Sequence, residues 1–273
     1  MNKKRLFFWI KILVIFYCGV GIALYYLQDR ILFHTEKLHP DYTYKFKIPF
    51  HELNIPFSKN DTLNLIKFLP DTNKEVKGVV LFFHGAQGNV ATYAERAALF
   101  TNQQYEVWMP DYPGFGKSSG EFSENKINSQ AFEIKKLALN RFPNNKIIIY
   151  GQSLGASVAT NLASTESNVK LILENPFYDV PDLLHHYTYI YPWSSMSKYR
   201  FSVNDAMLYL NHSVQINIII GNTKELHSKA SANKLKSLLD SNDSFVRIDQ
   251  ETATDMCNEQ EYKDVVEKLL RDN

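Results

Sequence analysis

Hydrophobic residues follow three patterns along the chain, and the first is a long uninterrupted run at the N-terminal end. The residues from Leu6 to Leu27 are apolar apart from Lys11 and a few small or polar uncharged positions. In a helix this run is about 30 Å long, which matches the hydrocarbon core of a bilayer. The run predicts a transmembrane helix in which Lys11 lies near enough to one end to extend its ammonium group to the membrane surface.

The second pattern is an alternation of short apolar runs with segments whose apolar residues recur at helical spacing. Predicted strands are 51–57, 63–69, 78–83, 105–109, 147–150, 169–173, 216–220 and 245–249, and predicted helices include 93–100, 127–142, 154–163, 231–239 and 262–270. The first two strands, joined by a polar turn, predict an antiparallel hairpin. The later alternation predicts the α/β class, with a mostly parallel sheet and helices on both faces.

The third pattern is a segment from Phe177 to His212 that interrupts this alternation and is rich in aromatic residues. Its position between two predicted strands suits a small lid inserted into the sheet. The aromatic residues have two interpretations, ordinary packing within the lid or the lining of a substrate pocket. The aromatic members are Tyr187, Tyr189, Tyr191, Trp193, Tyr199 and Phe201.

The chain is long enough for one large α/β domain behind the apolar run. We expect residues 1–28 to form a cytoplasmic tip and transmembrane anchor, and residues 29–50 to form a linker lying back along the domain. Residues 51–273 then form one α/β domain with the lid at about 177–212.

Basic residues at positions 3, 4 and 5 precede the apolar run. They predict a cytoplasmic N-terminus and a domain on the opposite, periplasmic or extracytoplasmic side of a membrane, with membrane lipid as the partner of the helix. The alternative is a cleaved signal peptide. An uncleaved anchor is favoured because no small-x-small cleavage site follows the run, which continues as Tyr25-Tyr26-Leu27.

Charge, cysteine content and histidine spacing exclude three classes of function or site. The 30 Lys and Arg against 29 Asp and Glu give a net charge of +1 without long runs of one sign, so nucleic-acid binding is not expected. The two cysteines lie far apart, Cys18 within the apolar N-terminal run and Cys257 near the C-terminus, so a disulfide framework is not expected. Histidines and acidic residues show no metal-ligand spacing, so neither a metal nor another cofactor is predicted.

Candidate chemistry lies in Gly151-Gln152-Ser153-Leu154-Gly155, between an apolar strand and a helix of small residues. A serine in a sharp strand-to-helix turn needs glycines two residues away on each side, because the backbones there crowd together. The pattern predicts a nucleophilic Ser153 whose hydroxyl stands clear of the turn. An ordinary strand-to-helix turn with a serine near the helix cap is the alternative.

The order of motifs resembles that of the membrane-anchored α/β-hydrolases of the serine aminopeptidase-like superfamily. The resemblance implies that Ser153 is the nucleophile and that the backbone N–H groups of Leu154 and Ala86 form the oxyanion hole. It covers nearly the whole chain and implies that residues 51–273 form an α/β-hydrolase domain. The motifs that carry it are Gln28 to His34, Phe83 to Asn89, Asp111 to Ser118, the serine turn, and Leu173 to Phe177.

The chain departs from the family pattern at the other two members of the catalytic triad. Lys224 stands where the family has its aspartate, and Ala253 stands where it has its histidine, with no histidine later in the chain. Loss of the general base from a serine triad lowers kcat by about 10⁶-fold, and a residual rate enhancement of roughly 10³-fold comes from the oxyanion hole and binding.

Other residues could replace the missing base and acid. His227, near the expected acid loop, is the first candidate base, and His185 and His186 in the lid are others. Glu225 and Glu174 are candidate acids. Each also has a structural interpretation, as a surface histidine, a solvated glutamate or, for Glu174, a structural glutamate. His84 precedes the oxyanion loop, and the resemblance implies a loop-shaping role for it.

Two functions therefore remain open. The first is a membrane-tethered serine hydrolase that acts on an ester, thioester or amide of an unidentified small-molecule or acyl substrate. The second is a non-catalytic pseudo-hydrolase that keeps the fold as a binding or scaffolding domain at the membrane. The serine turn and oxyanion loop favour the first function, whereas Lys224 and Ala253 favour the second.

Overall fold

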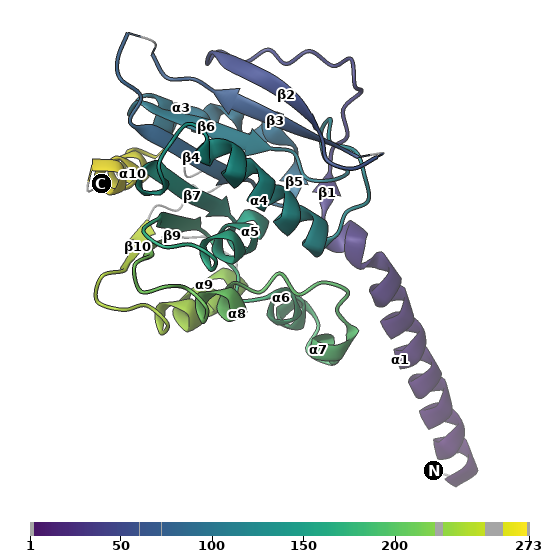
Figure 1. Cartoon of the computed structure of the whole chain (residues 1–273). Coiled ribbons are helices and arrows are strands. Elements are labelled where there is room, and N and C mark those ends of the chain that lie inside the picture. The colour runs from purple at the N-terminus through teal and green to yellow at the C-terminus, as the bar shows by residue number, and fades with distance from the viewer. Residues whose placement is uncertain (1–2, 60, 72, 222–225, 249–258, 272–273) are drawn as a thin grey trace.

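The computed structural model of the chain describes residues 3–59, 61–71, 73–221, 226–248 and 259–271. Within these ranges, eight strands form one sheet in the order β10-β9-β8-β7-β4-β6-β3-β2 (Figure 1). The strands of this sheet are β2 (Phe50–Pro56), β3 (Thr62–Phe68), β4 (Gly78–Phe83), β6 (Tyr105–Pro110), β7 (Ile147–Gln152), β8 (Lys170–Glu174), β9 (Gln215–Gly221) and β10 (Ser244–Ile248). A separate pair consists of β1 (His34–Thr35) and β5 (Gln87–Gly88).

The pairing of the strands confirms the predicted α/β class. β2 pairs with β3, and β3 with β6, in antiparallel orientation, while the other neighbours in the large sheet are parallel. The register places Phe83 opposite Gly151 and Gln152 opposite Glu174. The carboxyl ends of β4, β7 and β8 therefore meet at one edge of the sheet, where ligands bind in open α/β sheets.

Helices cover both faces of the sheet (Figure 1). The helical elements are α2 (Val90–Tyr93), η1 (Ala94–Arg96), α3 (Ala97–Thr101), α4 (Glu124–Leu139), η2 (Asn144–Lys146), α5 (Leu154–Ala163), α9 (Leu226–Lys236) and α10 (Gln260–Arg271), together with the lid helices and α1 described below. Successive residues of β7 illustrate the two layers, because Ile149 packs on the α5 side and Tyr150 on the α10 side. A strand buried on both faces must be apolar at every position, which explains the continuous apolar run of β7.

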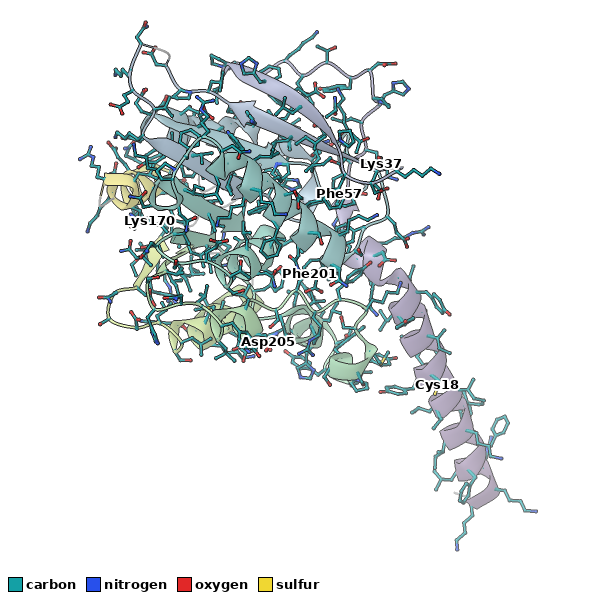
Figure 2. All side chains as sticks on the ribbon, viewed as in Figure 1. Cys18, Lys37, Phe57, Lys170, Phe201 and Asp205 are labelled. Carbon is teal, nitrogen blue, oxygen red and sulfur yellow. The ribbon has the colours of Figure 1, made fainter. Side chains whose placement is uncertain are left out.

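α1 (Lys3–Leu32) is a single helix of 30 residues that extends from the body of the protein. It is long and apolar enough to cross a membrane. Figure 2 shows Cys18 on the part of the helix that projects away from the sheet. The helix continues to Leu32, into the segment expected to be linker, and β1 begins at His34.

The segment expected to form a lid lies between β8 and β9 and contains α6 (Val180–Tyr187), α7 (Trp193–Met196) and α8 (Val203–Met207). Six of its aromatic residues differ in burial. Tyr191, Trp193 and Phe201 are buried and Tyr199 is half-buried, whereas Tyr187 and Tyr189 are exposed. Ordinary packing therefore accounts for the buried and half-buried residues and leaves Tyr187 and Tyr189 unexplained.

We predict that Gly155→Ala destabilises the domain, because a Cβ at this position would lie 1.9 Å from the carbonyl oxygen of Phe83. Overpacking of this kind costs about 1–3 kcal/mol or more in the free energy of unfolding. Gly19→Ala is the matched control, since nothing lies within 4 Å of its added Cβ. Urea unfolding followed by tryptophan fluorescence measures both variants, and equal stabilities would contradict the close approach.

Candidate active site

Ser153 occupies a strained turn between β7 and α5. Its backbone has φ 50° and ψ −111°, a conformation that a residue with a side chain rarely adopts. A Cβ on Gly151 would lie 2.2 Å from the carbonyl oxygen of Gly155, so the first glycine of the motif is required by the close passage of the backbone. The Ser153 N–H donates to the Glu174 carbonyl oxygen at 2.9 Å, which fixes the turn against β8.

The loop that would supply the other oxyanion donor follows β4 and contains Ala86. Its neighbour Gly85 lies beside the serine turn, because a Cβ on Gly85 would be 3.8 Å from the Gln152 carbonyl oxygen. Leu154 begins α5, and the first N–H groups of a helix have no acceptor within that helix. The fold therefore brings Ala86 and Leu154, the two residues predicted to supply oxyanion N–H groups, to the same edge of the sheet as Ser153.

Asp111 is a buried carboxylate that holds the oxyanion loop in place. Its Oδ1 accepts the N–H of Val90 at 2.8 Å, and its Oδ2 accepts the Tyr44 hydroxyl at 3.2 Å and the Lys117 N–H at 3.3 Å. Burial raises the pKa of Asp111 to about 6, although these hydrogen bonds act in the opposite direction. Gly116 belongs to the loop that follows Asp111 in the chain. A Cβ on Gly116 would lie 1.9 Å from Oδ2, so this position admits only glycine.

His84 is fully buried beneath the same loop. Its Nδ1 is 2.8 Å from the Gly85 carbonyl oxygen, and its ring stacks against Tyr93 with centroids 5.1 Å apart. Burial lowers the pKa of His84 to about 4, so the ring is neutral at neutral pH. These contacts fit a residue that shapes the loop, and among the described residues the His84 ring makes no hydrogen bond to Ser153.

β1 connects α1 directly to the oxyanion loop. The His34 N–H donates to the Ala86 carbonyl oxygen at 3.1 Å, and the Glu36 N–H donates to that of Gly88 at 3.2 Å. The Asn89 side chain returns a hydrogen bond to the Glu36 carbonyl oxygen at 3.2 Å. The peptide on one side of Ala86 is therefore held by the segment that leaves α1.

Glu174, a candidate acid, points into the sheet's α10 face and is buried. Both of its carboxylate oxygens lie 2.8 Å from Nη1 of Arg96. The Tyr262 hydroxyl donates to Oε2 at 2.8 Å, and the Tyr150 hydroxyl donates to the same oxygen. An arginine and two tyrosines thus surround the carboxylate, and no imidazole hydrogen-bonds to it in the part of the chain that the structure describes.

The candidate bases in the lid lie on α6. His185 is exposed and contacts Tyr189 edge-on with ring centroids 5.4 Å apart. His186 has its Nδ1 2.7 Å from the Asp182 carbonyl oxygen of its own helix. Among the described residues, no histidine ring hydrogen-bonds to Ser153, so the structure gives neither residue the position of a base.

The remaining candidates cannot be placed in the site. Lys224, Glu225 and Ala253 lie outside the described residues. His227 belongs to α9, but its side chain also lies outside what the structure describes. Within the described residues there is no group of three or more potential metal ligands.

Asn175 follows β8 at the carboxyl edge of the sheet, and its sequence pattern alone predicted no role for it. It has φ 45°, and its side-chain Oδ1 accepts the Gly221 N–H at 2.8 Å. Its own N–H donates to the Ile219 carbonyl oxygen at 2.9 Å. Asn175 therefore fixes the point where the chain enters residues 222–225, and its place in the Glu-Asn-Pro motif was the available signal.

We predict that Glu174→Gln weakens the fold and leaves the reactivity of Ser153 unchanged. Removing one partner of a buried ion pair costs about 3–5 kcal/mol. The exposed Glu133→Gln, which breaks a surface pair with Lys136, is the matched control and should leave stability nearly unchanged. Urea unfolding and the labelling rate of Ser153 by a fluorophosphonate are measured together. Slower labelling of a stably folded Glu174→Gln variant would instead identify Glu174 as the catalytic acid.

Sequence comparisons find relatives that share part of this chain. An uncharacterized protein, R595, of Acanthamoeba polyphaga mimivirus is 32% identical over 188 residues, which are 59% of this chain and 61% of the viral protein. Protein bem46 of Schizosaccharomyces pombe is 30% identical over 145 residues, 51% of this chain and 48% of its own length. Lysophosphatidylserine lipase ABHD12 of Gallus gallus is 32% identical over 109 residues, 37% of this chain and 29% of its own. The chain thus spans less than two thirds of each of these relatives.

Solved structures show the same fold. An α/β-hydrolase from Vibrio vulnificus superposes with a TM-score of 0.67 at 17% identity, over 80% of each chain. An esterase from Pyrococcus furiosus superposes with a TM-score of 0.65 at 17% identity, over 88% of this chain and 98% of the esterase. The family model of the serine aminopeptidases, S33, matches residues 74–254, well over half of the chain. The chain has the α/β-hydrolase fold and belongs to this serine aminopeptidase family.

Proposed function

We propose that the chain is a membrane-tethered serine hydrolase of low activity that cleaves an ester, thioester or amide bond. The observation that carries the proposal is the strained backbone of Ser153, with φ 50° in the turn between β7 and α5. Such strain costs of order 1–3 kcal/mol and persists where the fold holds a residue for function. An ordinary strand-to-helix turn has no need of it.

In this mechanism the Ser153 hydroxyl attacks the substrate carbonyl carbon and its proton passes to a base. The substrate's C–O, C–S or C–N bond then breaks, the departing alcohol, thiol or amine takes up a proton, and an acyl-Ser153 intermediate remains. The developing oxyanion accepts hydrogen bonds from the N–H groups of Leu154 and Ala86. Water then attacks the acyl carbon, releases the acid and restores the hydroxyl. The position of Leu154 at the N-terminus of α5 adds the favourable end of the helix dipole to this stabilisation.

The low activity follows from the replacement of the family's acid and histidine by Lys224 and Ala253. A serine without a general base is a weak nucleophile, and the oxyanion hole alone sustains roughly 10³-fold rate enhancement over water. Water, or a substitute such as His227, would accept the proton. The proposal therefore concerns slow turnover of a reactive substrate.

The tether is α1, with its basic N-terminal residues on the cytoplasmic side and the domain on the other side. An ester of a membrane lipid is the substrate class that we favour, because a relative of this chain is a lysophosphatidylserine lipase. The chain covers 29% of that relative, so the substrate is inferred from a shared segment.

A second function is a non-catalytic binding or scaffolding domain at the membrane. The paired replacements, Lys224 and Ala253, favour it because two members of one catalytic unit have been lost together. Fold alone does not decide between the two functions. They differ in the reactivity of Ser153 and in whether the missing groups restore it.

We predict that a fluorophosphonate probe labels Ser153 slowly, because the hydroxyl is partly accessible in its turn but lacks an identified base. Intact-mass measurement follows the adduct over time, with Ser153→Ala as the control that must not be labelled. Rapid, stoichiometric labelling would show that a base exists. His227→Ala is then the first variant to test for loss of that rapid labelling.

We predict that Lys224→Asp combined with Ala253→His raises hydrolysis of a small activated ester above the parent's rate. Each single change should do much less, since an imidazole beside the Lys224 ammonium resists protonation and a lone carboxylate has no imidazole to orient. The gain should be modest, because a misplacement of about 1 Å can lower the rate 10²-fold.

The control for this rescue is the same pair of changes in a Ser153→Ala background, where any gain must vanish. A folded double variant that gains nothing, while its Ser153 still reacts with the probe, would favour the binding function. A gain that survives Ser153→Ala would place the ester hydrolysis elsewhere on the protein.

A further inference from the structure

The lid contacts α1 at several points along the helix. Near the C-terminal end of α1, Nζ of Lys198 is 3.1 Å from Oδ2 of Asp29, and the Tyr199 hydroxyl donates to Oδ1 of Asp29 at 2.8 Å. One residue further toward the N-terminus, the side chain of Gln28 donates to the Met196 carbonyl oxygen at 3.0 Å and accepts the Lys198 N–H at 2.8 Å. Gln28 is fully buried by these contacts.

A second group of contacts between the lid and α1 lies about three turns nearer the N-terminus of the helix. The ring of Tyr191 stacks on Tyr17 with centroids 4.7 Å apart and packs against Gly21, where a Cβ would lie 2.9 Å from the ring. The Tyr191 hydroxyl donates to the Tyr17 carbonyl oxygen at 3.0 Å, and the Tyr17 hydroxyl donates to that of Ile190 at 2.7 Å. As the lid runs back from Lys198 to Ile190, it descends along α1, and α7 lies beside that helix in Figure 1.

The charges on α1 fix the depth of this descent relative to a membrane. A span of about 30 Å that begins at Leu6, after the basic residues, ends near Tyr25 and Tyr26, and tyrosines are enriched at that boundary. Asp29 and Lys198 then lie at or above the boundary, in water. Tyr17 lies about 12 Å below it, because eight residues separate Tyr17 from Tyr25.

We propose that the tip of the lid, Tyr187 to Ile190, is immersed in the outer leaflet of the bilayer that α1 crosses. Tyr187 is 62% exposed, and Tyr189 and Ile190 are each 69% exposed. Large apolar side chains exposed together next to a membrane span are covered by lipid acyl chains once the span is inserted. This accounts for the aromatic residues that packing within the lid leaves unexplained.

A shallower placement of the lid conflicts with the charges of α1. If Tyr17 lay at the outer boundary, the same 30 Å would reach past Lys11 and would also enclose the basic residues at positions 3 to 5. Each cation near the centre of a bilayer makes insertion of the helix less favourable. The placement with the boundary at Tyr25 leaves only Lys11 in the core, close to the inner end.

The proposal rests on the membrane tether of the proposed function and is independent of catalysis. It is tested on the full chain in phosphatidylcholine vesicles, in a background with Cys18→Ser and Cys257→Ser. A nitroxide is attached at Ile190→Cys, at Val14→Cys within the span, and at Tyr209→Cys. Tyr209 is 76% exposed and follows α8, which packs on α5. Collision rates with oxygen, which enters lipid, and with a water-soluble nickel chelate are compared.

The ratio of oxygen to nickel collisions should be several-fold higher at Ile190 than at Tyr209, and should approach the ratio at Val14. A ratio at Ile190 equal to that at Tyr209, with Val14 in lipid, would overturn the immersion of the lid and leave the tether intact. If Val14 also contacts water, the tether itself is wrong, and the immersion falls with it. Neither result depends on whether Ser153 is reactive, so the proposed chemistry is judged separately.

Discussion

The close packing of backbone against backbone at the start of α5 is the constraint on which the site depends. A Cβ on Gly155 would lie 1.9 Å from the Phe83 carbonyl oxygen, and one on Gly151 would lie 2.2 Å from that of Gly155. β4, β7 and α5 can meet so closely only because both positions are glycine. Ser153, between them, is forced to φ 50°, and its side chain is carried to the carboxyl edge of the sheet. The same approach places Leu154 beside the loop that contains Ala86.

A second set of contacts links α1, the loop that contains Ala86 and the lid to one another. α1 leads into β1, whose His34 N–H is bonded to the Ala86 carbonyl oxygen. Along its length, α1 contacts the lid through Asp29, Gln28 and Tyr17. Movement of the helix relative to the sheet would therefore act on the loop that contains Ala86 and on the lid together. In our proposal the bilayer contacts two of these three parts, α1 and the lid tip.

The sequence was sufficient for the fold because the strands are continuous apolar runs and the helices have a clear period. The hairpin of β2 and β3, the parallel strands and the lid all follow the predicted order. The serine motif predicted its turn for the same local reason, since only glycine allows the backbones to approach. Boundaries were less predictable, and α1 continues to Leu32 because no glycine or proline lies between Tyr25 and Leu32.

Contacts between segments that are distant in the chain could not be predicted from the sequence. Nothing local indicates that Asp111 binds the N–H of Val90, or that Glu174 is enclosed by Arg96 from 78 residues away. The role of β1 also depends on pairing with β5, a partner of two residues that has no strand-like pattern. Such buried polar contacts are specified by tertiary packing, so a sequence shows the residues without their partners.

The central claim is that Ser153 retains its turn and oxyanion donors while lacking an imidazole. The most direct test is a crystal structure of the chain after prolonged reaction with a phosphonate, in which the tetrahedral adduct on Ser153 mimics the intermediate. We expect the phosphonyl oxygen to accept hydrogen bonds from the Leu154 and Ala86 N–H groups, with no histidine ring within about 3 Å of Ser153 Oγ. A histidine ring at that distance, from His227 or elsewhere, would contradict the claim and identify the missing base.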